Sequence, residues 1–188
     1  FDKEVQRLVG GIVAATIEVY NSISAELLPT PAKFHYTLNL RDISKVFQGM
    51  LMISPLKCKD QDTLSKLWLH ESQRVFYDRL INFEDQGWFE KLACDLLSRH
   101  LGQMPQTPDQ IFGENSVLFC DFMKAGVDVE NRRYELGGID KITSLLGDAL
   151  DEYNVSFPTR MNLVFFSDAV RHIARMSRIL RQPRGNAM

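Results

Sequence analysis

The chain has 188 residues, a formal net charge of −2 and 45% hydrophobic residues, which is enough apolar material for one substantial core or two small ones. This near-neutral balance argues against a dedicated nucleic-acid-binding protein, because such proteins are normally clearly basic. No uninterrupted apolar run approaches the roughly 18 residues of a membrane span, and no signal peptide opens the chain. We therefore expect no nucleic acid and no membrane among its partners.

The cysteines indicate the redox environment of the protein, and the first residue bears on whether the chain is a piece of a longer one. Cys58, Cys94 and Cys120 lie far apart and form no C-x-x-C pair, so we expect reduced thiols in a cytosolic protein rather than disulfides or a zinc site. The chain begins at Phe1 without an initiator methionine, and we expect it to be a piece of a longer protein.

The first predicted helix runs from Asp2 to Ser24. Pro29 and Pro31 follow it and prevent the helix from extending further. Gly10 and Gly11 lie inside this helix and cost about 1 kcal/mol each relative to alanine. Either the close packing of another helix or a kink would explain them. The apolar stripe of the helix has the helical spacing and comprises Val5, Leu8, Val9, Ile12, Val13, Thr16, Ile17, Tyr20 and Ile23.

The second helix begins at Asn39, a favourable N-cap residue, and Asp42 stands three positions on, where its carboxylate can complete a capping box. Arg41 falls in the first turn, where unpaired N–H groups make the helix end electropositive and a cation costs up to about 1 kcal/mol. An anion bound at the same place would compensate, because helix N-termini bind phosphate. The alternatives are that Arg41 extends into solvent or pairs with a carboxylate.

A third helix is predicted from Thr63 to Ile81. Its apolar side chains occupy most of its faces, so we expect other elements of the protein to bury it. Charged residues at i,i+3 and i,i+4 spacing on such a helix indicate side chains that fix its orientation at an interface. To this interface we assign Trp68, His70, Glu71, Arg74, Asp78 and Arg79. The His70-Glu71 pair resembles the start of H-E-x-x-H, but position 74 is an arginine, so we expect no metal site.

A fourth helix is predicted from Glu84 to Leu101, and the Pro- and Gly-rich segment 102–116 after it marks the clearest boundary in the chain. Two segments, Val117–Met123 and Arg133–Leu136, could form short strands or extended packing segments, and a helix is predicted from Ile139 to Tyr153.

The last predicted helix, Phe166 to Leu180, should bury the apolar residues Ala169, Val170, Ile173, Met176 and Leu180. Its other side carries Arg171, Arg175 and Arg178. An arginine stripe can bind phosphate or RNA, but it is more often a solvated or partner-facing surface.

Three segments together resemble the dynein heavy chain, specifically its axonemal branch. Leu27–Asp42 (LLPTPAKFHYTLNLRD) is similar to the segment that carries the sensor-2 arginine in the lid of the third AAA+ unit. Leu67–Leu80 (LWLHESQRVFYDRL) is similar to the W-x-H-E-x-x-R-x-F-x-D-R-L helix of that lid, and Met161–Met188 resembles the lead-in to the Walker A loop of the fourth unit. The resemblance implies a mainly α fold, a helical bundle of the AAA+ small (lid) subdomain type, with at most a short β element near 116–136.

The resemblance divides the chain into a lid at 1–112, a connector with short extended segments and a helix at 113–160, and a lead-in to the fourth unit at 161–188 that ends before its phosphate loop. It implies that Arg41 is the sensor-2 arginine, directed toward the γ-phosphate of ATP in the third unit. It also implies adenine contacts from Leu38 and Leu40 in the third unit and from Leu163 and Val164 in the fourth. Plain core packing is the alternative for each of these apolar residues.

The implied function is a nucleotide-responsive lid that couples the ATP state of the third unit to its neighbour in a minus-end-directed microtubule motor of cilia. The implied cofactor is ATP or ADP with Mg²⁺ in the parent motor, with none held tightly by this piece. The implied partners are the large subdomains of the third and fourth units, the dynein intermediate and light chains, and microtubules. The implied location is the cytoplasm, the cytoskeleton and the ciliary axoneme. Because no Walker A loop, Walker B carboxylates or arginine finger can be assigned, we expect this piece not to be an enzyme by itself, although the parent motor is an ATPase.

Two other functions stay open. The chain could be a stand-alone helical adaptor without nucleotide chemistry, in which Arg171, Arg175 and Arg178 bind an acidic partner. A self-contained enzyme is the third hypothesis, although the sequence offers no acid/base pair or nucleophile constellation for it.

Overall fold

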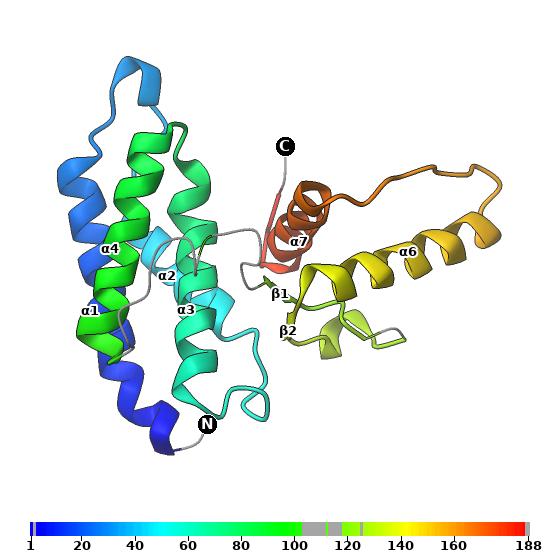
Figure 1. Ribbon diagram of the computed structural model, residues 1–188, viewed down its shortest axis with the longest axis horizontal. Coiled ribbons are helices and arrows are strands. Elements are labelled where there is room, and N and C mark those ends of the chain that lie inside the picture. Colours follow the sequence, from blue (N-terminus) through cyan, green and yellow to red (C-terminus); the bar gives the residue numbers. More distant parts are fainter. Residues whose placement is uncertain (2, 103–111, 113–117, 125, 187–188) are drawn as a thin grey trace. The chain divides into compact units, whose positions relative to one another are not determined.

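The computed structural model describes residues 1, 3–102, 112, 118–124 and 126–186, which form two compact units, Phe1–Ser116 and Val117–Met188 (Figure 1). The described residues are mainly helical with a single small sheet, which confirms the predicted mainly α fold. The three-part division into 1–112, 113–160 and 161–188 stays a prediction. The predicted boundary segment 102–116 lies mostly outside the described residues.

Among the residues that the structure describes, the first unit contains the α-helices α1 (Lys3–Glu26), α2 (Leu40–Met50), α3 (Gln61–Val75) and α4 (Phe83–Leu101). Two short 3-10 turns, η1 (Pro31–Lys33) and η2 (Tyr77–Arg79), lie in the connections. Helix α1 packs against α2, α3 and α4, and α2 packs against α3 (Figure 1). Each helix begins within a few residues of its predicted start, because asparagine or aspartate caps set the beginnings of α2, α3 and α4.

The third helix ends earlier than predicted, at Val75 rather than Ile81, and continues as the turn η2. The reason is tertiary. The carbonyl of Arg79 contacts the His35 ring at 3.0 Å, and the N–H of Ile81 donates to the Tyr36 hydroxyl at 3.0 Å. Both backbone groups therefore bond to the segment that precedes α2 instead of to a further helical turn.

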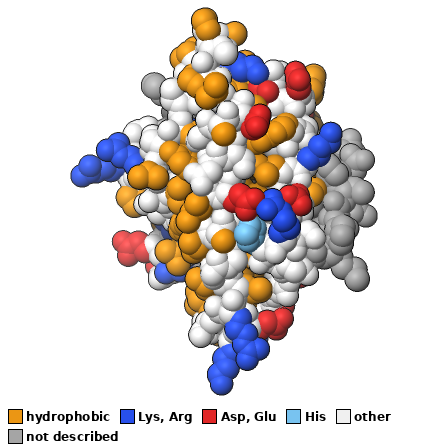
Figure 2. Space-filling model, turned by 90° about the vertical axis from the view of Figure 1, so that its left-hand side faces the viewer, with side chains coloured by type: hydrophobic (Ala, Val, Ile, Leu, Met, Phe, Trp, Pro, Cys, Tyr) orange, Lys and Arg blue, Asp and Glu red, His pale blue; other side chains and the backbone are white. Residues whose placement is uncertain are grey.

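The buried face of α1 differs from the predicted stripe. Val5, Ile12, Thr16 and Ile23 are buried as expected, but Val9, Val13 and Ile17 are 53%, 39% and 44% exposed. Ala15 and Val19 are buried in their place, because the neighbouring helices meet the opposite edge of the apolar stripe. Figure 2 shows a strip of apolar side chains open on this side of the unit.

Of the two explanations for the glycines of α1, close packing of another helix applies at Gly11. A Cβ at this position would collide with the carbonyl oxygen of His100 on α4, whereas a Cβ on Gly10 would meet nothing within 4 Å. By length and composition alone α1 could also cross a membrane. It packs against α2, α3 and α4, and 28% of its apolar 18-residue window is buried in the structure.

The second unit contains two short antiparallel strands, β1 (Leu118–Cys120) and β2 (Glu135–Gly137), and two helices, α6 (Ile139–Ser156) and α7 (Ser167–Arg181). Leu118 pairs with Gly137 and Cys120 with Glu135, so the predicted short β element is confirmed. A 3-10 turn, η3 (Val129–Asn131), lies between the strands. The core of this unit consists of Leu118, Cys120, Met123, Ile142, Val170 and Ala174.

The predicted burial of α7 was wrong at its C-terminal end. Met176 and Leu180 are 46% and 67% exposed, whereas Arg178 is 7% exposed. The buried carboxylate of Asp121 explains the rotation: Ser177 Oγ donates to it at 2.9 Å, and Arg181 Nε lies 2.8 Å from it. These polar contacts turn the side of α7 that carries Arg178 and Arg181 toward the core of the second unit. Met176 and Leu180 consequently face solvent.

Candidate functional site

The N-terminus of α2 carries a complete capping box. Asn39 has extended backbone angles, φ −144° and ψ 170°, and its side-chain oxygen accepts a hydrogen bond from the Arg41 N–H at 2.8 Å. Asp42 Oδ2 accepts from the Asn39 N–H at 3.0 Å, which completes the reciprocal pair. The predicted cap is therefore confirmed, and caps of this kind contribute about 0.5–2 kcal/mol.

Arg41 is exposed in the first turn of this helix. Its guanidinium makes no hydrogen bond or ion pair with any other residue that the structure describes. Of the two simple alternatives to anion binding, pairing with a carboxylate is thus absent among the described residues, and extension into solvent remains. A cation held at an electropositive helix end without a protein partner is well placed for a phosphate.

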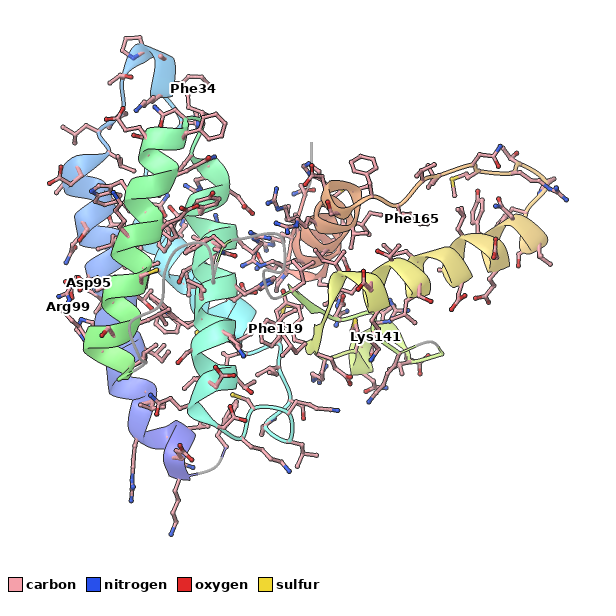
Figure 3. The ribbon with its side chains drawn as sticks, viewed as in Figure 1. Phe34, Asp95, Arg99, Phe119, Lys141 and Phe165 are labelled. Carbon is pink, nitrogen blue, oxygen red and sulfur yellow. The ribbon has the colours of Figure 1, made fainter. Side chains whose placement is uncertain are left out.

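Two apolar residues, Leu38 and Leu40, precede Arg41 within three positions of the chain. Leu38 is half-buried, and Leu40 and Phe34 are 72% and 74% exposed. Figure 3 places Phe34 in the turn between α1 and α2. Leu40 therefore stands in solvent next to an exposed cation in the chain, a combination that suits a ligand with an apolar part and an anionic part.

The Asp42 carboxylate is 1% exposed and has two cationic partners. Arg79 Nη2 lies 2.5 Å from Oδ1 and Lys45 Nζ lies 3.2 Å from the same oxygen. Burial raises the pKa of Asp42, but the hydrogen bonds from the Asn39 N–H and the Arg79 guanidinium outweigh it and hold that pKa below its ordinary value. Asp42 is therefore ionised at neutral pH and fixes the start of α2 to the end of the α3 segment.

The six residues assigned from the sequence to an interface lie along α3 and η2. Trp68 is fully buried and its Nε1 donates to Thr16 Oγ1 on α1 at 2.9 Å. Arg74 and Asp78 form the predicted i,i+4 pair at 2.9 Å. These contacts join helices of the same unit, and a role for the six residues toward another domain stays a prediction.

Glu71 is fully buried, and its carboxylate lies against Gly49 of α2, where a Cβ atom would collide with it. His70 is 3% exposed, with Nε2 3.8 Å from Glu71 Oε1. The H-E pair of the sequence thus packs inside the bundle. No group of three or more His, Cys, Asp or Glu side chains suited to a metal ion occurs in the part of the chain that the structure describes.

Sequence reasoning missed two polar clusters. Asp85 Oδ2 accepts from Lys33 Nζ at 2.6 Å and from the Tyr36 hydroxyl at 2.8 Å, which anchors the α1–α2 connection to the start of α4. Sequence separations of about fifty residues gave no local signal for these contacts.

The second missed cluster joins α1 to α4. Arg99 contacts Glu18 and Asp95 at 2.7 Å each, and His100 Nε2 lies 2.6 Å from Glu18 (Figure 3). The side chains of His100 and Arg99 hold the pKa of Glu18 below its ordinary value. Figure 2 shows a histidine with acidic and basic side chains beside the apolar strip. Only the Asp95–Arg99 spacing of four residues was readable from the sequence.

The remaining predicted residues, Leu163 and Val164, belong to the second unit. They are 53% and 81% exposed and lie in the extended segment between α6 and α7. Asn154 holds one end of this segment, donating to the Met161 carbonyl at 3.0 Å and accepting from the Met161 N–H at 2.8 Å. Phe165 packs against the core of the unit beside α7 (Figure 3). Leu163 and Val164 are therefore not part of the core of this unit, which argues against plain core packing as their role.

Residues 12–109, more than half of the chain and including the whole α2 cap, match the AAA+ lid domain. The chain belongs to the AAA+ lid domain family. The C-terminal part of this lid-containing chain, residues 161–188, matches the P-loop containing dynein motor region D4.

The chain is similar over nearly its whole length to axonemal dynein heavy chains, which confirms the resemblance to that family seen in the sequence, while the assignment of the lid to the third AAA+ unit stays a prediction. It is 41% identical over 189 residues to human dynein axonemal heavy chain 6, covering 100% of this chain. It is 47% identical over 178 residues, 94% of this chain, to human dynein axonemal heavy chain 1, and 38% identical over 202 residues to mouse dynein axonemal heavy chain 12, covering 100% of this chain. The chain spans only 4% of the length of the first two relatives and 6% of the third.

Proposed function

We propose that this chain is a part of the motor ring of an axonemal dynein heavy chain and that its lid responds to the nucleotide bound in the third AAA+ unit through Arg41. The family match to the lid and the similarity to axonemal dynein heavy chains support the placement in a motor. The observation that carries the sensing role is the exposed guanidinium of Arg41 at a capped helix N-terminus, without a partner among the described residues.

The chemistry of this position suits a terminal phosphate. The first turn of α2 offers the positive end of the helix dipole, and a planar guanidinium can bind two phosphate oxygens at once. Bound ATP with Mg²⁺ would supply the terminal phosphate that ADP lacks. Leu38 and Leu40 would form an apolar wall beside the adenine of the same nucleotide, and Leu163 and Val164 would do so for the fourth unit.

Nucleotide-dependent contact gives the lid its mechanical role. Arg41 would bind the terminal phosphate only in the ATP state, so ATP and ADP would favour different angles of the lid against its large subdomain. Because the chain continues from the lid into the region that matches D4, such a rotation would pass to the fourth unit. The lid regulates rather than hydrolyses, since we assign no Walker A or Walker B segment in it.

The parent protein would be a minus-end-directed, ATP-hydrolysing microtubule motor of the ciliary axoneme, part of the cytoskeleton in the cytoplasm. Its partners would be microtubules, the dynein intermediate and light chains and, within the same chain, the large subdomains of the third and fourth units.

The alternative of an adaptor that binds an acidic partner requires a row of arginines on α7 facing outward. Arg178 is only 7% exposed, and the neighbouring Arg181 is 2.8 Å from the buried Asp121. These positions count against the adaptor surface.

The test is Arg41→Ala in the full heavy-chain motor, with nucleotide affinity measured by titration at the third AAA+ unit. Charge-assisted hydrogen bonds contribute about 1.5–3 kcal/mol, so ATP should bind roughly 10- to 100-fold more weakly while ADP changes by less than about threefold. Arg7→Ala, which removes the same charge from an exposed position of α1, is the control and should change neither affinity. Equal ATP affinity in the Arg41→Ala and unmodified motors would rule the sensing role out.

A further inference from the structure

Arg79 contacts the polypeptide on both sides of the α2 cap. Its Nη1 donates to the Thr37 carbonyl at 3.5 Å, and its own carbonyl contacts His35 Nε2 at 3.0 Å. Its Nη2 binds Asp42 Oδ1, which lies inside the first turn of α2. One residue of η2 therefore braces the chain before the cap and the helix after it.

The bonds continue from Asp42 to Arg41. Asp42 Oδ2 accepts from the Asn39 N–H at 3.0 Å, and Asn39 Oδ1 accepts from the Arg41 N–H at 2.8 Å. Three successive hydrogen bonds thus lead from the Arg79 guanidinium through Asp42 and Asn39 to the backbone of Arg41, and Asp42 is 1% exposed. A buried carboxylate held on both sides has little freedom to move.

Lys45 also binds Asp42 but cannot serve the same purpose. It lies on α2 itself, three residues beyond Asp42, so it moves with the helix that would have to be positioned. Its side chain is 45% exposed, against 30% for Arg79. Arg79 is the partner of Asp42 that ties α2 to a different segment of the unit.

We propose that Arg79 is a positioning residue that, through Asp42 and Asn39, sets the direction in which Arg41 presents its guanidinium to the terminal phosphate of the nucleotide. This inference rests on the proposed function of Arg41. It gives the D-R pair of the W-x-H-E-x-x-R-x-F-x-D-R-L segment a role in nucleotide response, although Arg79 itself touches no nucleotide.

The unit should tolerate the loss of Arg79. Asp42 would keep the Asn39 N–H and Lys45 as partners, so no buried carboxylate would be left uncompensated. The start of α2 would lose its external brace, and displacements of about 1 Å at a phosphate-binding group cost up to roughly 100-fold in function. The effect should therefore appear in nucleotide selectivity before it appears in folding.

The experiment compares Arg79→Ala, Arg79→Lys and the control Lys45→Met in the full heavy-chain motor, with titrations of ATP and ADP at the third AAA+ unit and thermal unfolding of each variant. We expect Arg79→Ala to weaken ATP binding roughly 10-fold with ADP within about twofold, because only the terminal phosphate contact is misplaced. Arg79→Lys should restore part of the loss, and Lys45→Met should match the unmodified motor.

The double variant Arg41→Ala/Arg79→Ala identifies the route of the effect. If Arg79 acts through Arg41, the double variant binds ATP as weakly as Arg41→Ala alone. A further full loss in the double variant, or an equal loss for ATP and ADP in Arg79→Ala, would overturn the positioning role while leaving the function of Arg41 intact. An Arg41→Ala motor with unchanged ATP affinity would instead overturn the proposed function and this inference with it. If Arg79→Ala does not fold, Arg79→Met replaces it, since it keeps an unbranched side chain but has no N–H donor for Asp42.

Discussion

The carboxylate of Glu71 on α3 occupies the space that a Cβ atom would need at Gly49 on α2. Both residues are buried, and Glu71 is fully enclosed. The glycine is therefore required by the approach of the two helices rather than by backbone conformation. This contact fixes how α2, and with it the capped end that carries Arg41, lies on α3.

Gly49→Ala should therefore destabilise the first unit. Alanine gains about 1 kcal/mol of helix propensity over glycine, but the buried carboxylate has to move, and overpacking of this kind costs about 1–3 kcal/mol. We expect a net loss of up to about 2 kcal/mol in the free energy of unfolding, measured by urea denaturation. A stability above that of the unmodified chain would show that Glu71 does not lie against Gly49.

Gly10 and Gly11 provide a matched pair on one helix. Gly10→Ala should stabilise the chain by about 0.5–1 kcal/mol, because a Cβ there meets nothing within 4 Å. Gly11→Ala should destabilise it, because the Cβ meets the backbone carbonyl of His100, which cannot move without shifting α4. Denaturant titrations of both variants check the difference in sign. Equal effects at the two positions would contradict the close approach of α1 and α4.

The stability contributed by Asp42 should depend on pH in one direction. The folded-state pKa of Asp42 lies below its unfolded value, so its contribution is fully present above the unfolded pKa of about 3.9 and is lost as pH falls through the folded pKa. At neutral pH, Asp42→Asn should cost about 1–3 kcal/mol, less than a fully buried pair because Arg79 is 30% exposed.

Unfolding free energies of the Asp42→Asn and unmodified chains between about pH 2 and pH 7 check this dependence. Their difference should shrink below about pH 4. Asp62→Asn is the control, since it removes an exposed carboxylate paired with Lys66, and it should change stability by less than about 0.5 kcal/mol throughout. A difference between the Asp42 variant and the unmodified chain that grows on acidification would contradict the ion pair.

The parts of the fold that depend on neighbouring residues were predictable from the sequence. The α2 cap needs only Asn39 and Asp42, which stand three positions apart, and the Arg74–Asp78 pair needs only one helical turn. The bond from Arg79 to Asp42 spans 37 residues and left no local pattern. Local rules could thus locate Arg41 at a helix end but could not identify the residue that holds that end in place.

Apolar spacing predicted which elements are helices better than which side of a helix is buried. On α1, Val13 and Ile17 continue the stripe yet remain exposed, because the stripe is wider than the surface that neighbouring helices cover. On α7, the buried Asp121 attracts Ser177 and Arg181 and leaves Leu180 in solvent. A buried polar partner from another element decided the orientation there, and the helix sequence alone did not contain it.

The most direct test of the proposed role of Arg41 is an experimental structure of an axonemal dynein motor that contains this chain, with a non-hydrolysable ATP analogue in the AAA+ unit to which the lid belongs. We expect a guanidinium nitrogen of Arg41 within about 2.7–3.2 Å of a terminal phosphate oxygen, and no such contact with ADP bound. An Arg41 side chain that faces solvent or binds a protein carboxylate in the ATP state would contradict it.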